Sequence, residues 1–171
     1  TYLDAAHHDK FTPHIRGGGM VNSVSQTSYE QSAPPHGFEA GTLNAAGIVA
    51  SAKAAELVEA HRDDIAQHEA QLKTYLENRL DDADISYYDS PHPRGPVISL
   101  NTRNDAYDIA HILNDHDVCI RAGNHCADPL MSELERSGTA RISLAYYNTQ
   151  DDIDQTLHAL QEATSLLGGP L

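Results

Sequence analysis

The chain has 171 residues, a length that accommodates one domain, or one domain and part of another. Hydrophobic residues make up 40% of it, enough to build a core, and no apolar run approaches the roughly 18 residues of a membrane-crossing helix. The net charge of −14 argues against nucleic acid and anionic membranes as main partners, because both require a cationic surface.

The acidic residues are scattered, which favours a general solubility adaptation over an acidic substrate-binding surface. Many acids and few lysines are typical of proteins from salt-loving organisms, whose high salt screens the repulsion between the acids. The two cysteines suit a reducing, cytoplasmic compartment. The first residues carry neither an initiator Met nor the pattern of a signal peptide, so we expect an internal start and a chain that is a fragment.

Residues 1–40 are rich in turn formers and polar side chains, which predicts irregular loop with brief extended pieces. A loop of this length indicates a binding or active-site loop, or a tail separated from its own domain. The next segment, Ala45–Ala60, has helical spacing, with Asn44 as its N-cap. A second helix follows, with an apolar face made of Ile65, Leu72, Leu76 and Leu80.

Short strands and helices alternate in the rest of the chain. Strands are predicted at Ile85–Tyr88, Val97–Leu100, Val118–Ile120 and Thr139–Leu144, and helices at 105–116 and Ile153–Leu167. This order predicts a compact α+β unit, in which a small antiparallel-rich sheet carries helices on one face.

Cys126 follows a predicted strand in a loop with turn formers, which predicts an exposed thiol. Arg121 and His125 are neighbouring cations, or potential cations, that favour the nucleophilic thiolate. Local chemistry alone favours an ordinary surface thiol. Cys119 lies inside the apolar run Val118–Ile120, and we expect it to be a small core residue.

Two further features are suited to anions. Arg141 lies in an otherwise apolar strand and needs a partner, either a bound carboxylate or one of the chain's many acids. Gly41 and Thr42 precede a helix whose first N–H groups suit a phosphate, although an ordinary helix start fits equally well. The run Gly17–Gly19 lacks the pattern of a phosphate-binding loop.

No metal site is expected from the sequence. The 11 histidines are dispersed, and solvated surface positions are the simplest interpretation. The two cysteines are not spaced as a C-x-x-C pair, which argues against a thiolate zinc site.

Four segments, in the same order and with similar spacing, resemble those of one enzyme family across essentially the whole chain. They are Arg16–Val21 (RGGGMV), Phe38–Ile48 (FEAGTLNAAGI), Arg121–Met131 (RAGNHCADPLM) and Ala140–Thr149 (ARISLAYYNT). The family is that of the Suf-type (group II) cysteine desulfurases, which are class V aminotransferase-like enzymes dependent on pyridoxal phosphate. The resemblance implies an α/β fold, the fold type I of aminotransferases, represented here by its C-terminal portion.

The resemblance implies a role for each matching residue. Cys126 matches the nucleophile that takes sulfur from L-cysteine as a persulfide, leaving L-alanine. Arg141 matches the arginine that binds the substrate carboxylate, and Arg121 and His125 match residues of the same pocket. Gly41 and Thr42 match a turn that reaches the cofactor phosphate of the other subunit in a homodimer.

Two departures from the family pattern stand out. The family has His-His before its cysteine, and Asn124 replaces the first His here, which removes any acid–base role at that position. The lysine that holds pyridoxal phosphate lies in a Ser-x-His-Lys context, and none of Lys10, Lys53 and Lys73 has that context. The resemblance therefore implies a chain that is inactive alone.

The resemblance implies that residues 1–60 belong to the large cofactor domain and that residues 61–171 form the small C-terminal domain. It also implies delivery of sulfur to an acceptor protein of the SUF system for iron–sulfur cluster assembly. The alternatives are a selenocysteine lyase or another class V enzyme, and a non-catalytic fragment that only binds a partner. Since Ala45–Ala60 would lack its usual cover, we expect the isolated chain to associate or to be poorly stable.

Overall fold

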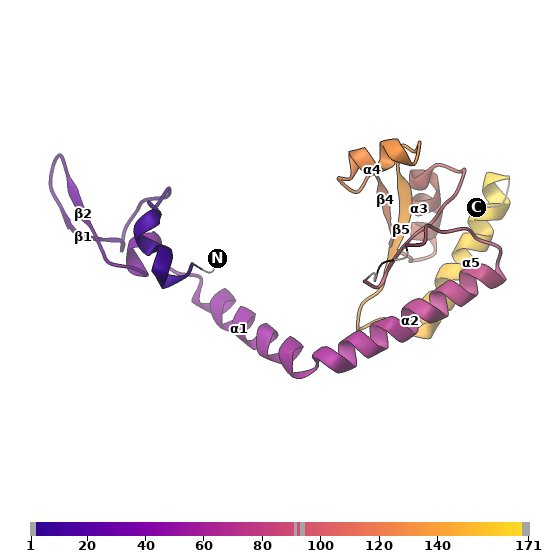
Figure 1. Cartoon of the computed structure of the whole chain (residues 1–171), viewed down its shortest axis with the longest axis horizontal. Coiled ribbons are helices and arrows are strands. Elements are labelled where there is room, and N and C mark those ends of the chain that lie inside the picture. The colour runs from indigo at the N-terminus through magenta and orange to yellow at the C-terminus, as the bar shows by residue number, and fades with distance from the viewer. Residues whose placement is uncertain (1–2, 91, 93–94, 169–171) are drawn as a thin grey trace. The chain divides into compact units, whose positions relative to one another are not determined.

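The computed structural model describes residues 3–90, 92 and 95–168. The chain divides into two compact units, Thr1–Glu59 and Ala60–Leu171, whose elements are labelled in Figure 1. Among the described residues, no helix is both long and apolar enough to cross a membrane.

The first unit begins with short elements. They are the 3-10 helices η1 (Ala5–Lys10) and η2 (His36–Phe38) and the antiparallel hairpin of β1 (Val21–Val24) and β2 (Tyr29–Gln31). Ser25 closes the hairpin, because its N–H donates to the Ser28 carbonyl at 2.8 Å and its Oγ accepts from the Ser28 N–H at 3.0 Å. The two short strands agree with the predicted irregular loop with brief extended pieces, although their pairing into a hairpin was not predicted.

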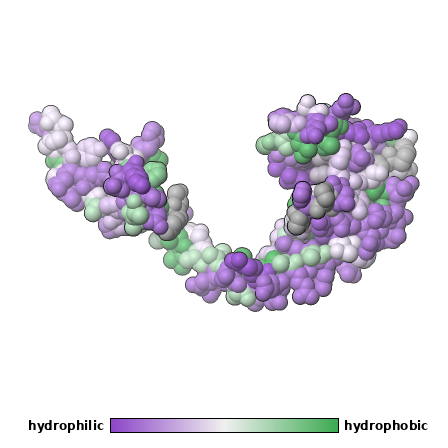
Figure 2. Space-filling model, in the orientation of Figure 1, coloured by the Kyte–Doolittle hydropathy of each residue, from purple (hydrophilic) through white to green (hydrophobic). Residues whose placement is uncertain are grey.

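The helix α1 (Ala45–Ala60) follows, as its spacing predicted. Asn44 caps it, accepting a hydrogen bond from the Gly47 N–H at 3.0 Å. No residue of α1 is buried, although its side chains are mainly apolar; Val49 and Val58 are 69% and 57% exposed. The exposed apolar residues of α1 appear in green shades in Figure 2.

The second unit is built on a three-stranded antiparallel sheet with the order β3-β5-β4. Its strands are β3 (Val97–Ser99), β4 (Arg121–Gly123) and β5 (Thr139–Ser143), and its helices are α2 (Arg62–Asp82), α3 (Ala106–Asp115), α4 (Asp128–Glu133) and α5 (Gln150–Leu167). Alternation along β5 directs Ala140 and Ile142 into the core and Arg141 to the opposite face.

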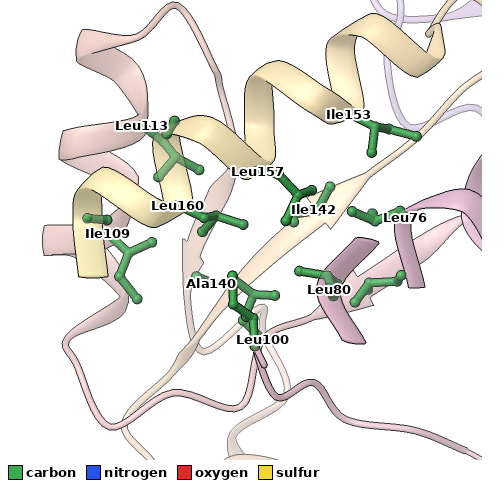
Figure 3. Packing of buried hydrophobic residues seen from close by; sticks show 14 of the residues in the cluster. Leu76, Leu80, Leu100, Ile109, Leu113, Ala140, Ile142, Ile153, Leu157 and Leu160 are labelled. Atoms are coloured by element: carbon green, nitrogen blue, oxygen red, sulfur yellow. The ribbon is translucent and has the colours of Figure 1, made fainter. Parts of the chain in front are cut away.

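The core lies between one face of this sheet and the helices α2, α3 and α5 (Figure 3). Leu72, Leu76 and Leu80 recur every four residues on α2, so one face of that helix is buried. These side chains meet Ile142 from β5 and the apolar faces of the other two helices. The predicted arrangement of helices on one face of a small antiparallel sheet is confirmed.

Thr149 and Asp152 begin α5 with a capping box. The Asp152 carboxylate accepts from the Thr149 N–H at 2.8 Å, and the Thr149 hydroxyl accepts from the Asp152 N–H at 3.3 Å. The hydrogen bond from the Thr149 backbone is the main reason that the pKa of Asp152 is lowered. With this cap α5 begins at Gln150, three residues before its first predicted residue, Ile153.

The predicted strand Val118–Ile120 was wrong, and strand pairing begins only at Arg121. The reason lies at the end of α3, where the Val118 N–H donates to the Leu113 carbonyl at 3.0 Å and is not available to a sheet. Cys119 is exposed and lines a cavity of about 150 Å³, so its assignment to the core was also wrong.

The predicted strand Ile85–Tyr88 is reduced to one bridge, Tyr87 to Leu100. Two backbone hydrogen bonds flank it, from Tyr88 to Ser99 at 2.9 Å and from Asn101 to Ser86 at 2.8 Å. The segment therefore lies beside β3 as an extended edge and not as a full strand.

Candidate active site

Cys126 lies in a tight turn between β4 and α4. The Ala127 N–H donates to the Asn124 carbonyl at 3.0 Å, which closes the turn around His125 and Cys126. Both central residues have a φ of 57°, the positive value of a type I′ turn. A side chain in this conformation costs roughly 1 kcal/mol, and such strain is concentrated at functional sites. The turn leaves Cys126 exposed, as predicted.

The side chain of Asn124 organises this turn. Its Oδ1 accepts from the Cys126 N–H at 3.1 Å, and its Nδ2 donates to Asp128 Oδ1 at 2.7 Å. Asp128 begins α4, so one amide joins the turn to the first turn of that helix. An Asn that bonds the backbone two residues later is a common turn-former. Asn124 therefore has a structural role in this turn.

Arg121 and Arg141 are direct partners across β4 and β5, and Ser99 is the partner of Arg141 on β3. Directly opposed residues project to the same face of a sheet, with their Cβ atoms about 5 Å apart. Arg141 is on the face opposite the core, because its neighbours Ala140 and Ile142 are buried. The sheet therefore places the side chains of two arginines on the same face, at directly opposed positions.

Neither guanidinium has an acidic partner within 4 Å in the described part of the chain, despite the net charge of −14. The Nε of Arg141 is buried and makes no hydrogen bond there. An unpaired buried donor costs about 1–3 kcal/mol, and a charged one costs more. The alternative that Arg141 forms a salt bridge with an acid of this chain is therefore not observed among the described residues. An anion from outside could pair with both arginines.

His125 bends from the turn onto the same face of the sheet. Its Nε2 lies 3.0 Å from both the carbonyl oxygen and the hydroxyl of Thr139, which is two residues before Arg141 on β5. The Nδ1 atom is buried and has no partner among the described residues. If Nε2 carries the proton and donates to the carbonyl, Nδ1 is left as an acceptor.

The pKa of His125 is lowered, first by burial and then by the positive charges of Arg141 and Arg121; the hydrogen bond to Thr139 raises it in part. His125 is therefore neutral near pH 7, since an unperturbed imidazole already titrates at about 6.5. The expectation that His125 supplies a positive charge for the Cys126 thiolate is corrected. The positive charges close to this ring are those of Arg141 and Arg121, which help to lower the pKa of His125.

Gly123 allows the backbone before the turn to pack closely against Tyr107 and Gly138. Its φ is 117°, and an added Cβ would lie 2.7 Å from the hydroxyl of Tyr107 on α3. A Cβ on Gly138 would lie 2.6 Å from the Gly123 carbonyl carbon. The chain thus enters the turn of Cys126 through a close backbone contact that only glycine permits.

Gly41 and Thr42 lie in the first unit, before α1. The Gly41 N–H donates to the Gly18 carbonyl at 2.8 Å, which joins Gly41 to the Gly17–Gly19 run. Gly41 has a φ of 80° and open space where a Cβ would be, and the exposed Thr42 makes no hydrogen bond within the described part of the chain. An exposed hydroxyl beside a helix start suits a phosphate group, although the Gly41 N–H itself is occupied.

None of the three lysines lies in a site suited to holding a cofactor. Lys53 pairs with Glu56 at 3.0 Å and Lys73 with Glu77 at 3.8 Å, in both cases along one helix. Lys10 is exposed and lies 3.2 Å from the Nδ1 of His7. The residues present fit the phosphate end of pyridoxal phosphate and provide no lysine for its aldehyde end.

Sequence reasoning missed two residues of the site. Asn124 was noted only as a departure from the family pattern, although an Asn before a turn is itself a turn signal. Thr139 was assigned only to a strand, and its contact with His125 gave no local signal because the two are separated along the chain. The short helix α4 was also missed, although Asp128-Pro129 is a typical helix start.

The chain belongs to the aminotransferase class-V family, whose model matches residues 1–156. A probable cysteine desulfurase from Halobacterium salinarum is 38% identical over 159 residues, which cover 90% of this chain. Those residues are 38% of that relative, so the chain spans well under half of its length.

Two solved structures resemble this one. The apo structure of the cysteine desulfurase from Thermococcus onnurineus NA1 is 32% identical with a TM-score of 0.82, covering 96% of this chain and 42% of that one. The S-sulfonic acid form of a cysteine desulfurase from Escherichia coli is 28% identical with a TM-score of 0.77, covering 91% and 39%. The predicted α/β fold of pyridoxal-phosphate-dependent desulfurases is thus confirmed, with only part of that fold present in the chain.

Proposed function

We propose that this chain is the C-terminal portion of a Suf-type cysteine desulfurase, in which Cys126 takes sulfur from L-cysteine. One observation carries the proposal. The exposed turn of Cys126 follows the edge of a sheet face that carries two arginines, and neither arginine has an acidic partner among the described residues. His125 links them, because it adjoins Cys126 and bonds Thr139, two residues before Arg141. The relatives named as cysteine desulfurases support the same activity.

Arg141 binds the carboxylate of the substrate in this proposal. A guanidinium offers a planar set of donors that matches a carboxylate, and the buried Nε is a donor without an acceptor. Arg121, its neighbour across the sheet, adds a second positive charge to the same face. A bound substrate carboxylate would reduce the repulsion between the two arginine side chains, and this reduction would favour substrate binding.

Cys126 reacts with the substrate sulfur. Its thiolate forms an S–S bond with that sulfur, the bond from the sulfur to the substrate Cβ breaks, and the electron pair of that bond stays with the carbon. After the carbon takes up a proton, the products are L-alanine and a persulfide on Cys126. Exposure of Cys126 then allows a sulfur-acceptor protein of the SUF system to reach the persulfide for iron–sulfur cluster assembly.

Pyridoxal phosphate, when bound, supplies the electron sink that labilises this C–S bond. Gly41 and Thr42 contact its phosphate in our proposal, from the other subunit of a cytoplasmic homodimer. The lysine that holds the cofactor belongs to a part of the enzyme outside this chain, so the chain alone is inactive. We assign residues 1–60 to the large domain and 61–171 to the small one.

Replacing each cysteine in the complete enzyme tests the assignment. Cys126→Ser is expected to abolish L-alanine formation from L-cysteine and the persulfide, measured by amino-acid analysis and by mass spectrometry of the trapped peptide. Cys119→Ser is the matched control, because Cys119 is also exposed but lies before β4, and it should retain both. Alanine formation that survives Cys126→Ser would refute the role of Cys126. Activity on selenocysteine without activity on cysteine would instead indicate a selenocysteine lyase.

A further inference from the structure

A second cluster of ligand-type side chains lies in the second unit, apart from the turn of Cys126. His116 is the C-cap of α3, and His158 and Glu162 are on α5. One nitrogen of each imidazole and one oxygen of the carboxylate all lie within 4.8 Å of one another. The proposed desulfurase activity uses none of the three, and the sequence predicted no metal site because the histidines are dispersed along it.

The secondary structure explains why these side chains converge. His158 and Glu162 are four residues apart on α5, so they project from the same face of that helix. Gln155 lies on the same side one turn earlier, and its Nε2 donates to the His116 carbonyl at 2.7 Å. This bond attaches the end of α3 to α5, and the His116 N–H is itself bonded to the Leu113 carbonyl at 3.0 Å. The backbone of His116 is therefore held by hydrogen bonds to both α5 and α3.

The distances suit one small cation. The His116 Nε2 lies 2.8 Å from the Glu162 Oε2, and the rings of His116 and His158 have their centroids 6.1 Å apart. Zinc bound tetrahedrally at 2.0–2.2 Å from nitrogen and oxygen holds its ligand atoms about 3.3 Å apart. The largest distance between two ligand atoms would therefore shorten by no more than about 1.5 Å. Rotation of the exposed His158 and Glu162 side chains allows a change of this size.

We propose that His116, His158 and Glu162 bind a divalent transition metal of the zinc class, with water completing the coordination. Two imidazoles and one carboxylate favour zinc, nickel or copper over magnesium and calcium, which prefer all-oxygen ligands. The ion would take the place of the close contact between His116 Nε2 and Glu162 Oε2 and would link the end of α3 to α5. Both elements bury core side chains, so binding should stabilise the fold of the second unit.

Titration of the 171-residue chain with zinc chloride in a non-coordinating buffer tests the site. Calorimetry and thermal melts use the Cys119→Ser/Cys126→Ser background, because free thiolates also bind zinc. We expect one zinc bound with micromolar affinity and a raised Tm, with no effect of millimolar magnesium on either. Glu162→Gln and His158→Ala should each weaken binding by about tenfold or more, and remove the rise in Tm.

His111→Ala is the matched control, because His111 is an exposed histidine of α3 outside the cluster. It should bind zinc as the background protein does. The proposal is overturned if the background protein binds no zinc at millimolar concentration. It is equally overturned if Glu162→Gln and His158→Ala bind as tightly as His111→Ala, which would place the zinc elsewhere. Both substitutions alter exposed side chains, so the variants should fold and leave each outcome measurable.

Discussion

Arg121 and Arg141 face each other directly across β4 and β5, and neither has an acidic partner in the described part of the chain. The fold therefore maintains a repulsive pair in the one place where the proposed substrate carboxylate would bind. Opposed like charges on a sheet are destabilising by roughly 0.2–1 kcal/mol. This arrangement predicts opposite effects of one substitution on stability and on substrate binding.

Arg121→Gln should raise the free energy of unfolding of the chain by about 0.5 kcal/mol, because it removes one of two opposed charges. Urea titrations at low salt measure this gain, and the gain should shrink as salt screens the repulsion. In the complete enzyme the same substitution should raise the KM for L-cysteine. Arg103→Gln, at an exposed position outside the sheet, is the control and should change neither quantity. Lower stability in Arg121→Gln at low salt would contradict the repulsion.

Asn124→Ala should loosen the turn that holds Cys126, because it removes the hydrogen bonds to the Cys126 N–H and to Asp128. We expect a loss of about 1 kcal/mol in the free energy of unfolding. The rate at which a thiol reagent modifies Cys126 should also change, measured in a Cys119→Ser background. Asn114→Ala, at an exposed position of α3, provides the comparison. Equal stability and equal thiol reactivity in the two variants would show that Asn124 does not organise the turn.

The lowered pKa of His125 predicts an acid-sensitive stability. Above about pH 6.5 the ring is neutral in both folded and unfolded chains, so it adds no pH dependence there. As the pH falls from about 6.5 through the lowered pKa of the folded ring, the unfolded chain binds the proton first, and the free energy of unfolding falls. Below that pKa the loss levels off, because both states are then protonated.

Chemical denaturation of His125→Gln across this pH range measures the effect. The variant should lose less stability on acidification than the parent chain, whereas His111→Gln, which alters an exposed ring, should behave like the parent. An unchanged pH profile in His125→Gln would mean that other groups cause the acid sensitivity.

The uncovered apolar face of α1 predicts self-association of the isolated chain. Val49→Asp together with Val58→Asp should shift it toward monomer in sedimentation velocity, because exposed apolar area promotes association. Val24→Asp is a matched control, since Val24 is 71% exposed but lies on β1. A parent chain that sediments as a monomer at all concentrations would contradict this prediction.

For α2 and β5 the prediction rested on a periodic pattern that burial of one face leaves in the sequence. Leu72, Leu76 and Leu80 recur at helical spacing because one face of α2 is buried, and β5 alternates because only one of its faces meets the core. The hairpin of β1 and β2 left no such pattern, since nearly all of its residues are exposed. The run Val118–Ile120 had the composition of a strand, but the end of α3 uses the Val118 N–H.

Recognition of the site depended on resemblance more than on local chemistry. Cys126 by itself resembled a surface thiol, and its importance came from matching segments elsewhere in the chain. The pairing of Arg121 with Arg141 depends on strand register, which a sequence shows only after the strands are placed. Burial and those same arginines set the protonation of His125, so its charge could not be predicted from its neighbours in the sequence.

The alternation along β5 has a consequence for how such a chain can evolve. Arg141 faces the proposed substrate only because Ala140 and Ile142 point the other way into the core. A shift of this strand by one residue would bury a guanidinium and bring two core side chains to the surface. An insertion or deletion within β5 would therefore be harmful in two ways, because it would disturb the core and would also move Arg141 away from the proposed substrate. Variation in length must occur instead in the connecting loops.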